Sequence, residues 1–172
     1  MNLWQWLEKV DRQATANCRV LLKTRNVDAS LPLLFFLKFL STVLVVAALY
    51  FLGVTSVYTL DVGLDYFFGD VGSFFVVLVH FIKIASEDLL FVLPFLGLAG
   101  VFLDARYSVI LAGLFFSFLH LVNPGATIFL PVALLPSSII GAYIMQRYGL
   151  ISAVVAHVFY DTALAVLGVM TT

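Results

Sequence analysis

The sequence predicts an all-α integral membrane protein, a bundle of about six transmembrane helices preceded by an amphipathic helix at the membrane surface. Of its 172 residues, 63% are hydrophobic and 11% are charged, and the mean hydropathy is +1.11. The apolar residues fall into long runs, and such runs cross a bilayer as helices because helices satisfy their own backbone hydrogen bonds. We therefore expect one polytopic domain over residues 31–172, with residues 1–30 as a cytoplasmic N-terminal segment.

The N-terminal segment has the pattern of an amphipathic helix over residues 2–16, with apolar and charged side chains on opposite sides. Trp4 and Trp6 suit the boundary between lipid and water. This helix would either lie on the cytoplasmic surface or pack on the bundle. Five of the nine Lys and Arg residues precede the first apolar run, which predicts a cytoplasmic N-terminus.

Turn residues and polar breaks divide the apolar sequence into six spans. The segment before the second span contains three Asp residues and no Lys or Arg, which indicates a non-cytoplasmic loop. Two proline residues in the fifth span predict a kink or a break there. The predicted spans are 30–52, 73–84, 87–103, 107–121, 126–145 and 150–170.

Six spans and a cytoplasmic N-terminus predict a multi-pass protein of the inner (cytoplasmic) membrane with both termini in the cytoplasm. In this topology Arg106 and Arg147 lie outside, against the positive-inside rule. Lys38 interrupts the first span. We expect its long side chain to snorkel to the cytoplasmic interface, and a role in the functional site is the alternative.

Five ionisable residues lie within or at the ends of the predicted spans: Glu87, Asp88, His120, His157 and Asp161. An ionisable side chain in hydrocarbon costs roughly 2.5–3.5 kcal/mol on insertion scales, so its default interpretation is functional. His157 and Asp161 are one helical turn apart and share a helix face. In the predicted topology, residues from three spans can meet in a cavity in the cytoplasmic half of the bilayer.

Such a group of side chains suits the activation of water. A carboxylate in apolar surroundings can act as a base near neutral pH, and a histidine can hold the same water. A second histidine can donate to the oxyanion of a tetrahedral intermediate. Alternatively, these groups only tie helices together. The zinc-protease pattern HExxH and the GxSG of rhomboid-like enzymes are absent, and Gly69-Asp70 with Tyr160-Asp161 match presenilin-like motifs only in reversed order.

Three motifs give the chain a resemblance to a known family. The family's EExxxR appears as residues 87–92, with Asp88 in place of the second glutamate and Val92 in place of the arginine. FxxxH is intact at residues 116–120, and HxxxN/D is intact at residues 157–161. Over about half of its length the chain thus resembles the CPBP (Abi) family, the CAAX-processing and bacteriocin-processing glutamate-type intramembrane proteases.

The resemblance implies a role for each matched residue. Glu87 would be the general base on the catalytic water, with His120 as its partner, while His157 and Asp161 would stabilise the oxyanion. Asp88 would keep the charge of the second glutamate. The resemblance implies a mechanism without metal or other cofactor, in preference to a zinc site on Glu87 and the two histidines. With Val92 in place of the arginine, the motif lacks its cation, and Lys83 is a candidate replacement. Alternatively, the loss of the arginine marks an inactive relative.

We therefore predict an intramembrane endopeptidase that hydrolyses a peptide bond in a membrane-anchored protein or peptide. The resemblance and the short chain favour a compact bacterial member, for which trimming the apolar tail of a C-terminally sorted protein is one option. The expected partners are this substrate and the lipid bilayer, and the net charge of −1 gives no indication of nucleic-acid binding. The alternatives are an inactive scaffold or immunity-type binding protein and a small transporter. A transporter is disfavoured because residues 151–156 are apolar apart from Ser152.

Overall fold

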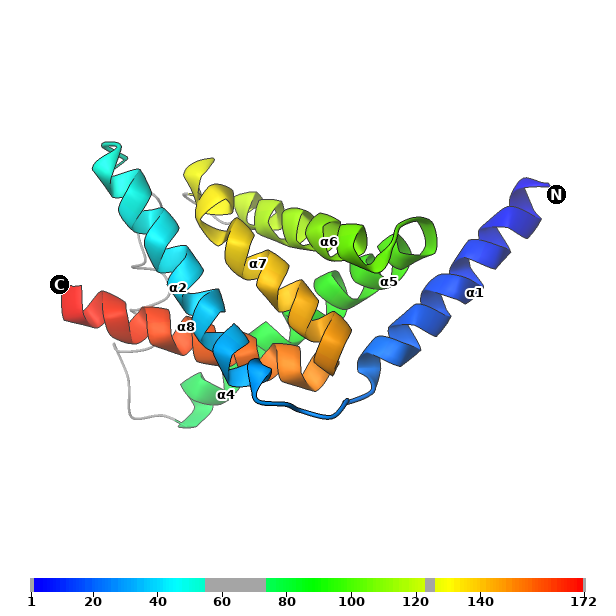
Figure 1. The fold of residues 1–172 in the computed structure, drawn as a ribbon, viewed down its shortest axis with the longest axis horizontal. Coiled ribbons are helices and arrows are strands. Elements are labelled where there is room, and N and C mark those ends of the chain that lie inside the picture. Colours follow the sequence, from blue (N-terminus) through cyan, green and yellow to red (C-terminus); the bar gives the residue numbers. More distant parts are fainter. Residues whose placement is uncertain (1, 55–73, 123–125, 172) are drawn as a thin grey trace.

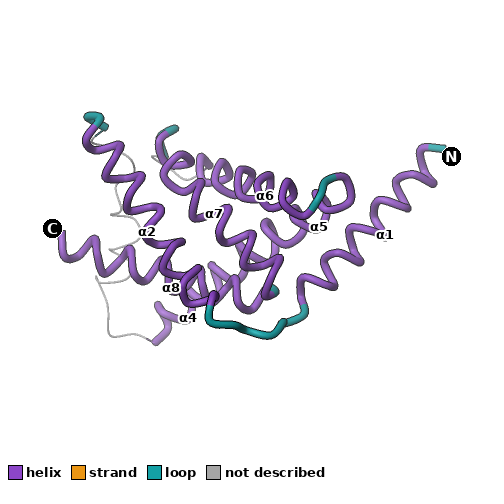
Figure 2. Tube along the Cα trace, viewed as in Figure 1, coloured by secondary structure: helices purple, strands orange, loops and turns teal. Residues whose placement is uncertain are grey.

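The computed structural model describes residues 2–54, 74–122 and 126–171 (Figure 1). Throughout these ranges the regular elements are helices, joined by short connections (Figure 2). This confirms the predicted all-α class and the N-terminal helix. The elements are α1 (Leu3–Leu22), α2 (Ser30–Phe51), α4 (Phe74–Glu87), a π-helical segment (Asp88–Val92), α5 (Leu93–Phe102), α6 (Ala105–Leu119), a 3-10 turn (His120–Val122), α7 (Phe129–Tyr148) and α8 (Leu150–Thr171).

Four helices in the described part of the chain are long and apolar enough to cross a membrane. The first is α2, the second is the continuous helix that ends with α5, the third is α6 together with its final turn, and the fourth is α7. Residues 150–164 of α8 form a shorter apolar helix. The chain is therefore a membrane protein. The printed bounds of the four are Ser30–Phe51, Phe81–Phe102, Ala105–Val122 and Phe129–Tyr148.

The predicted break between the second and third spans is wrong, because α4 continues through the π-helical segment into α5. The polar residues at 86–88 suggest a turn, but the Ser86 hydroxyl donates to the Ile82 carbonyl at 2.7 Å, inside the helix. The π-helical segment comes immediately before Pro94. In an α-helix Pro94 would be required to donate to the Leu90 carbonyl, which it cannot do. The wider turn, closed by Leu93 N–H on the Asp88 carbonyl, accommodates this position without ending the helix.

The joined helix changes the topology. It removes one of the six predicted crossings, and the N-terminus and the C-terminus lie at opposite ends of the molecule (Figure 1). The side of the membrane on which each terminus lies stays a prediction. Arg147 is also not on the far side from the N-terminal segment: its Nη2 lies 2.9 Å from Asp28 Oδ2 in the α1–α2 linker. Arg106 is the second residue of α6 and lies near the end of α5, where Phe102 meets Trp6 of α1 at 6.3 Å between ring centroids.

Helix α7 lies at the centre and contacts α2, α6 and α8. A Cβ atom on Gly113 of α6 would come within 2.7 Å of the Ile139 backbone, so the absence of a side chain allows the close crossing of α6 and α7. Ser117 Oγ donates to the Pro131 carbonyl at 2.8 Å, which provides a second tie between these helices. The prolines do not break the fifth predicted span, because α7 continues through Pro136.

Helix α1 packs along α5 over its C-terminal half. The Asn17 amide donates to the Gly97 carbonyl at 3.0 Å, and the Cys18 thiol lies 3.7 Å from the Leu93 carbonyl. Burial raises the pKa of the Cys18 thiol. The N-terminal half of α1 extends away from the bundle, and Trp4 in this half is 75% exposed. The helix thus packs on the bundle at one end, as one of the two predicted placements requires, and presents apolar side chains at the other. Its position at the membrane surface stays a prediction.

A cluster of polar groups, here called the linker latch, joins the α1–α2 linker to the α7–α8 turn. Asp28 accepts hydrogen bonds from Ser30 N–H at 2.9 Å and Tyr148 O–H at 2.7 Å, and Arg147 reaches its second oxygen. Gly149 closes the turn with φ +91°, where a Cβ would collide with the Lys23 carbonyl, so a side chain is excluded twice over.

Candidate active site

The acidic pair Glu87-Asp88 lies in the interior of the joined helix. Glu87 is 15 residues before Phe102, which is about 22 Å along the helix. His120 lies the same distance, about 22 Å, from Ala105 on the neighbouring antiparallel helix. Glu87 and His120 are therefore level with each other, far from the α5–α6 turn. The sequence predicted these residues near the side that carries α1, and the structure places them away from it.

Asp88, His157 and Asp161 form a row across two helices, in which Asp88 and His157 are buried and Asp161 is partly exposed. His157 Nδ1 lies 3.4 Å from Asp88 Oδ1, and His157 Nε2 lies 3.8 Å from Asp161 Oδ1. The side chains of Asp88 and His157 are 7% and 6% exposed. The 3.4 Å separation is an ion-pair distance, but its alignment is not that of a hydrogen bond, and Asp88 Oδ2 and His157 Nδ1 both lack a hydrogen-bond partner. The two groups are therefore close to each other without a hydrogen bond between them.

His120 joins this row from α6. Its Nδ1 lies 2.9 Å from the Phe116 carbonyl, which leaves Nε2 for another partner. Phe116 presents its ring at a right angle to both histidines, with centroids 4.9 Å from His120 and 5.8 Å from His157. The imidazole of His120 also lies within electrostatic range of Glu87, His157 and Asp161. In the FxxxH motif, the Phe116 ring thus contacts both His120 and His157 and helps to fix their positions relative to each other.

Lys38 is a member of the site that the main sequence prediction missed. It does not snorkel: the residue is 5% exposed, and its Nζ lies 4.9 Å from the centre of the Tyr160 ring. The ammonium is within electrostatic range of Asp88, Asp161 and Glu87. A Cβ on Gly141 would lie 3.3 Å from Nζ, so the glycine leaves room for the lysine. The signal in the sequence was a charged residue well inside an apolar run.

Lys83, the candidate replacement for the motif arginine, occupies a different position. Its Nζ lies 3.8 Å from Glu87 Oε1, but its side chain is 68% exposed, compared with 25% for Glu87. An exposed pair of this kind contributes little. The buried basic residue that interacts electrostatically with the acidic residues is therefore Lys38, from α2.

Tyr160 supports Lys38 through a second set of polar contacts. Its hydroxyl lies 3.0 Å from Thr42 Oγ1 and 3.5 Å from Ser137 Oγ. Thr42 is one helical turn after Lys38, so α2 contributes both the cation and a hydrogen bond to the ring under it. These contacts join α2, α7 and α8 beside the acidic residues.

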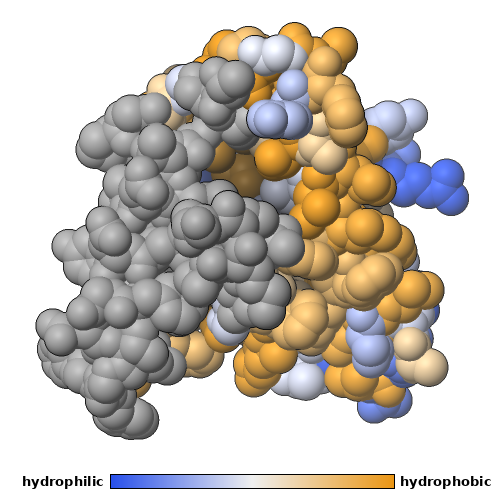
Figure 3. All heavy atoms as spheres, turned by 90° about the vertical axis from the view of Figure 1, so that its left-hand side faces the viewer, coloured by the Kyte–Doolittle hydropathy of each residue, from blue (hydrophilic) through white to orange (hydrophobic). Residues whose placement is uncertain are grey.

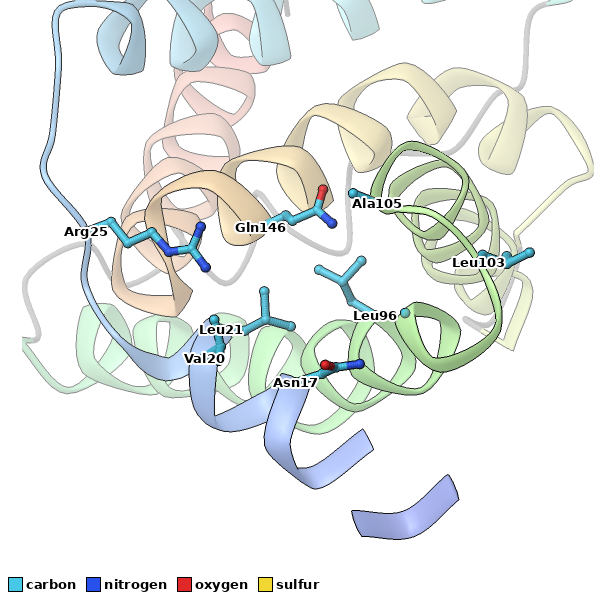
Figure 4. Close-up of a pocket in the computed structure, with 9 residues that line it drawn as sticks. Asn17, Val20, Leu21, Arg25, Leu96, Leu103, Ala105 and Gln146 are labelled. Atoms are coloured by element: carbon cyan, nitrogen blue, oxygen red, sulfur yellow. The ribbon is translucent and has the colours of Figure 1, made fainter. Parts of the chain in front are cut away.

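Within the described ranges, no group of three or more His, Cys, Asp or Glu side chains is arranged to hold a metal ion. A cavity of about 230 Å³ lies elsewhere, near the C-terminal half of α1 (Figure 4). None of the five candidate residues lines it. Its lining consists of Asn17, Val20, Leu21, Arg25, Leu96, Gly100, Leu103, Ala105 and Gln146.

Comparison with known families decides the relationship. The family described as type II CAAX prenyl endopeptidase Rce1-like matches residues 70–163. The chain belongs to this Rce1-like family. The match covers more than half of the chain and includes all five candidate residues, and it confirms the family predicted from the three motifs. It leaves out α1 and α2, and therefore Lys38. No curated protein and no solved structure matches the chain.

Proposed function

We propose that this Rce1-like protein is a glutamate-type intramembrane endopeptidase. The family supports a membrane endopeptidase in general. The observation that carries the finer assignment is the convergence of two acidic residues, two histidines and a third carboxylate from three helices, in an apolar bundle. Since ionisable groups in the membrane are costly, a cluster that serves only to tie helices together would be an expensive solution.

Glu87 is the base in this proposal. Its side chain is the most exposed of the acidic pair, at 25%, so water can reach it. A base must lie within hydrogen-bond reach of the proton it removes, directly or through one water. His120 is level with Glu87 and in electrostatic range, so one water held between them is the expected nucleophile.

His157 and Asp161 form the oxyanion side. An oxyanion donor at Nε2 needs a proton on that nitrogen. His157 Nδ1 faces Asp88 at 3.4 Å and Nε2 faces Asp161 at 3.8 Å, so a proton on Nε2 would be available to an oxyanion on that side. Asp88 is thus a positioning residue for His157, and Lys38 reduces the repulsion among the three carboxylates.

The test compares wild-type protein with Glu87→Gln in cells, by proteomic mapping of new protein termini. Glu87→Gln keeps the shape and removes the base, so we expect a loss of about 10²–10⁴-fold in cleavage rate at unchanged expression and thermal stability. Glu8→Gln is the matched control, because Glu8 is an exposed residue of α1 paired with Arg12. Cleavage that persists in Glu87→Gln would reject the assigned base.

A second candidate function, a non-catalytic scaffold, is favoured by one observation. Val92 occupies the place of the motif arginine and is 4% exposed within the apolar core, where no cation accompanies it. Lys38 weakens this candidate because it supplies a buried cation from another helix. Cleavage that requires none of the five candidate residues would leave the scaffold as the better assignment.

A further inference from the structure

The positive charges of the chain gather at one end of the bundle. Figure 1 shows α1, the α5–α6 turn and the α7–α8 turn at this end, with the C-terminus and the end of α2 at the other. Of the nine Lys and Arg residues, seven lie in α1, in the α1–α2 linker or next to these two turns, and the other two, Lys38 and Lys83, lie in α2 and α4. The seven are Lys9, Arg12, Arg19, Lys23, Arg25, Arg106 and Arg147.

This distribution indicates the orientation of the bundle. Cytoplasmic ends of membrane proteins carry an excess of Lys and Arg. The α1 end therefore faces the cytoplasm, and the C-terminal end of α8 faces the other side. The sequence between α2 and α4 agrees with this, since residues 55–73 contain three Asp and no Lys or Arg. The two exceptions in the predicted topology, Arg106 and Arg147, become regular members of the cytoplasmic set.

The candidate site lies beyond the middle of the membrane in this orientation. Glu87 and His120 are each about 22 Å along their helices from the α5–α6 turn, compared with a hydrocarbon core of about 30 Å. The base thus lies closer to the end opposite α1 than to the α1 end.

We propose that the site is entered from the non-cytoplasmic side, and that its substrates are exported proteins held in the membrane by an apolar segment. Outside the grey atoms, the surface at this end is mainly apolar (Figure 3). Val122, at the end of α6, is 76% exposed there, and Phe118 is 47% exposed. An apolar segment that enters from this side reaches Glu87 directly, whereas the modified tail of a cytosolic protein would need to cross more than half of the bilayer.

The substrate class rests on the proposed function, and its reaction is a simple hydrolysis. Glu87 takes one proton from the water, and the resulting hydroxide adds to the carbonyl carbon of the scissile peptide bond. The C–N bond then breaks, the proton on Glu87 passes to the leaving nitrogen, and a new carboxylic acid and a new amine remain, which exchange one further proton to become a carboxylate and an ammonium group. The water and the peptide account for all atoms, and no oxidation or reduction takes place.

The orientation is tested without reference to activity. In a Cys18→Ser background, single cysteines replace Lys83 and Leu52 at one end and Glu8 at the other, and a membrane-impermeant maleimide is added to right-side-out and inside-out vesicles. We expect Lys83→Cys and Leu52→Cys to react in right-side-out vesicles, and Glu8→Cys in inside-out vesicles. Leu52 is 79% exposed, which makes it a sensitive second position. The reverse pattern would overturn the proposal.

The substrate class is tested by the positions of the cleavage sites. New termini present with wild-type protein and absent with Glu87→Gln should lie at the non-cytoplasmic ends of membrane segments. Such termini in cytoplasmic regions would overturn the substrate class and still support a Glu87 protease. No difference between the two strains, together with the expected labelling, would reject the proposed function and the substrate class but retain the orientation.

Discussion

Two polar clusters of similar composition lie in this bundle, and they differ in how completely their groups are paired. In the linker latch, both oxygens of Asp28 accept hydrogen bonds, at 2.7–2.9 Å from the partners described above. In the candidate site, Asp88 Oδ2 and His157 Nδ1 have no hydrogen-bond partner. The latch is also half exposed, whereas Asp88 and His157 are almost fully buried.

We interpret this difference as the one between a structural role and the proposed functional role. An unpaired buried polar group costs about 1–3 kcal/mol, so a site optimised for stability would pair it or replace it with an apolar side chain. The latch follows that rule and the candidate site does not. In the proposed enzyme, a water or a substrate would complete the hydrogen bonding of Asp88 and His157.

The largest expected effect is at Lys38. Removal of one partner from a buried ion cluster typically costs about 3–5 kcal/mol, so Lys38→Met should lower both thermal stability and cleavage. Lys38→Arg should retain part of the cleavage. In Lys38→Met/Val92→Arg, an arginine one turn after Asp88 should restore cleavage, as measured by substrate processing and thermal unfolding in detergent. Full cleavage by Lys38→Met would show that the site does not depend on this cation.

His157 and Asp161 should differ in a graded way. Loss of one oxyanion donor costs about 10²–10³-fold in rate, so His157→Ala should be severe. Asp161→Asn should be milder, because the amide keeps the size of the side chain and can donate a hydrogen bond. Single-turnover cleavage rates of purified variants would measure both. An Asp161→Asn defect as large as that of His157→Ala would assign the negative charge of Asp161 an essential role.

Asp88→Asn tests the comparison itself. It removes a buried charge with an unpaired oxygen, so we expect unfolding at the wild-type temperature or above it, with a clear loss of cleavage. An interaction that serves only structure would give the opposite result, a fall in stability. The two measurements, made on the same preparation, distinguish these roles.

The smallest effect is expected at the latch. Hydrogen bonds from Ser30 and Tyr148 lower the pKa of Asp28, so its contribution to stability is complete above the unfolded pKa of about 3.9 and is lost as the pH falls through the lower folded pKa. Asp28→Asn should therefore lower the melting temperature slightly at pH 7, leave cleavage unchanged, and flatten the stability profile below pH 4. A stability profile identical to that of the wild type would show that the Asp28 carboxylate does not stabilise the latch.

The sequence was sufficient for the helical class and for the ends of the first span, which was predicted at 30–52 and lies at Ser30–Phe51. It also named the residues that the structure brings together at Asp88, His157 and Asp161, because ionisable side chains in apolar runs are conspicuous. It could not separate a turn at Ser86 from a helix that absorbs the same polar residues through its own carbonyl groups. Nor could it decide whether Lys38 faces lipid or protein, which depends on the helices that pack around it.

The π-helical segment Asp88–Val92 acts as a phase shift within the joined helix. One additional residue per turn rotates the part before it relative to the part after it by about 100°. The face of α5 that packs on α1 and the face of α4 that carries Glu87 are therefore set independently. The insertion or deletion of a single residue in this segment during evolution would rotate the acidic pair about the helix axis, while the contacts of α5 with α1 stay in place.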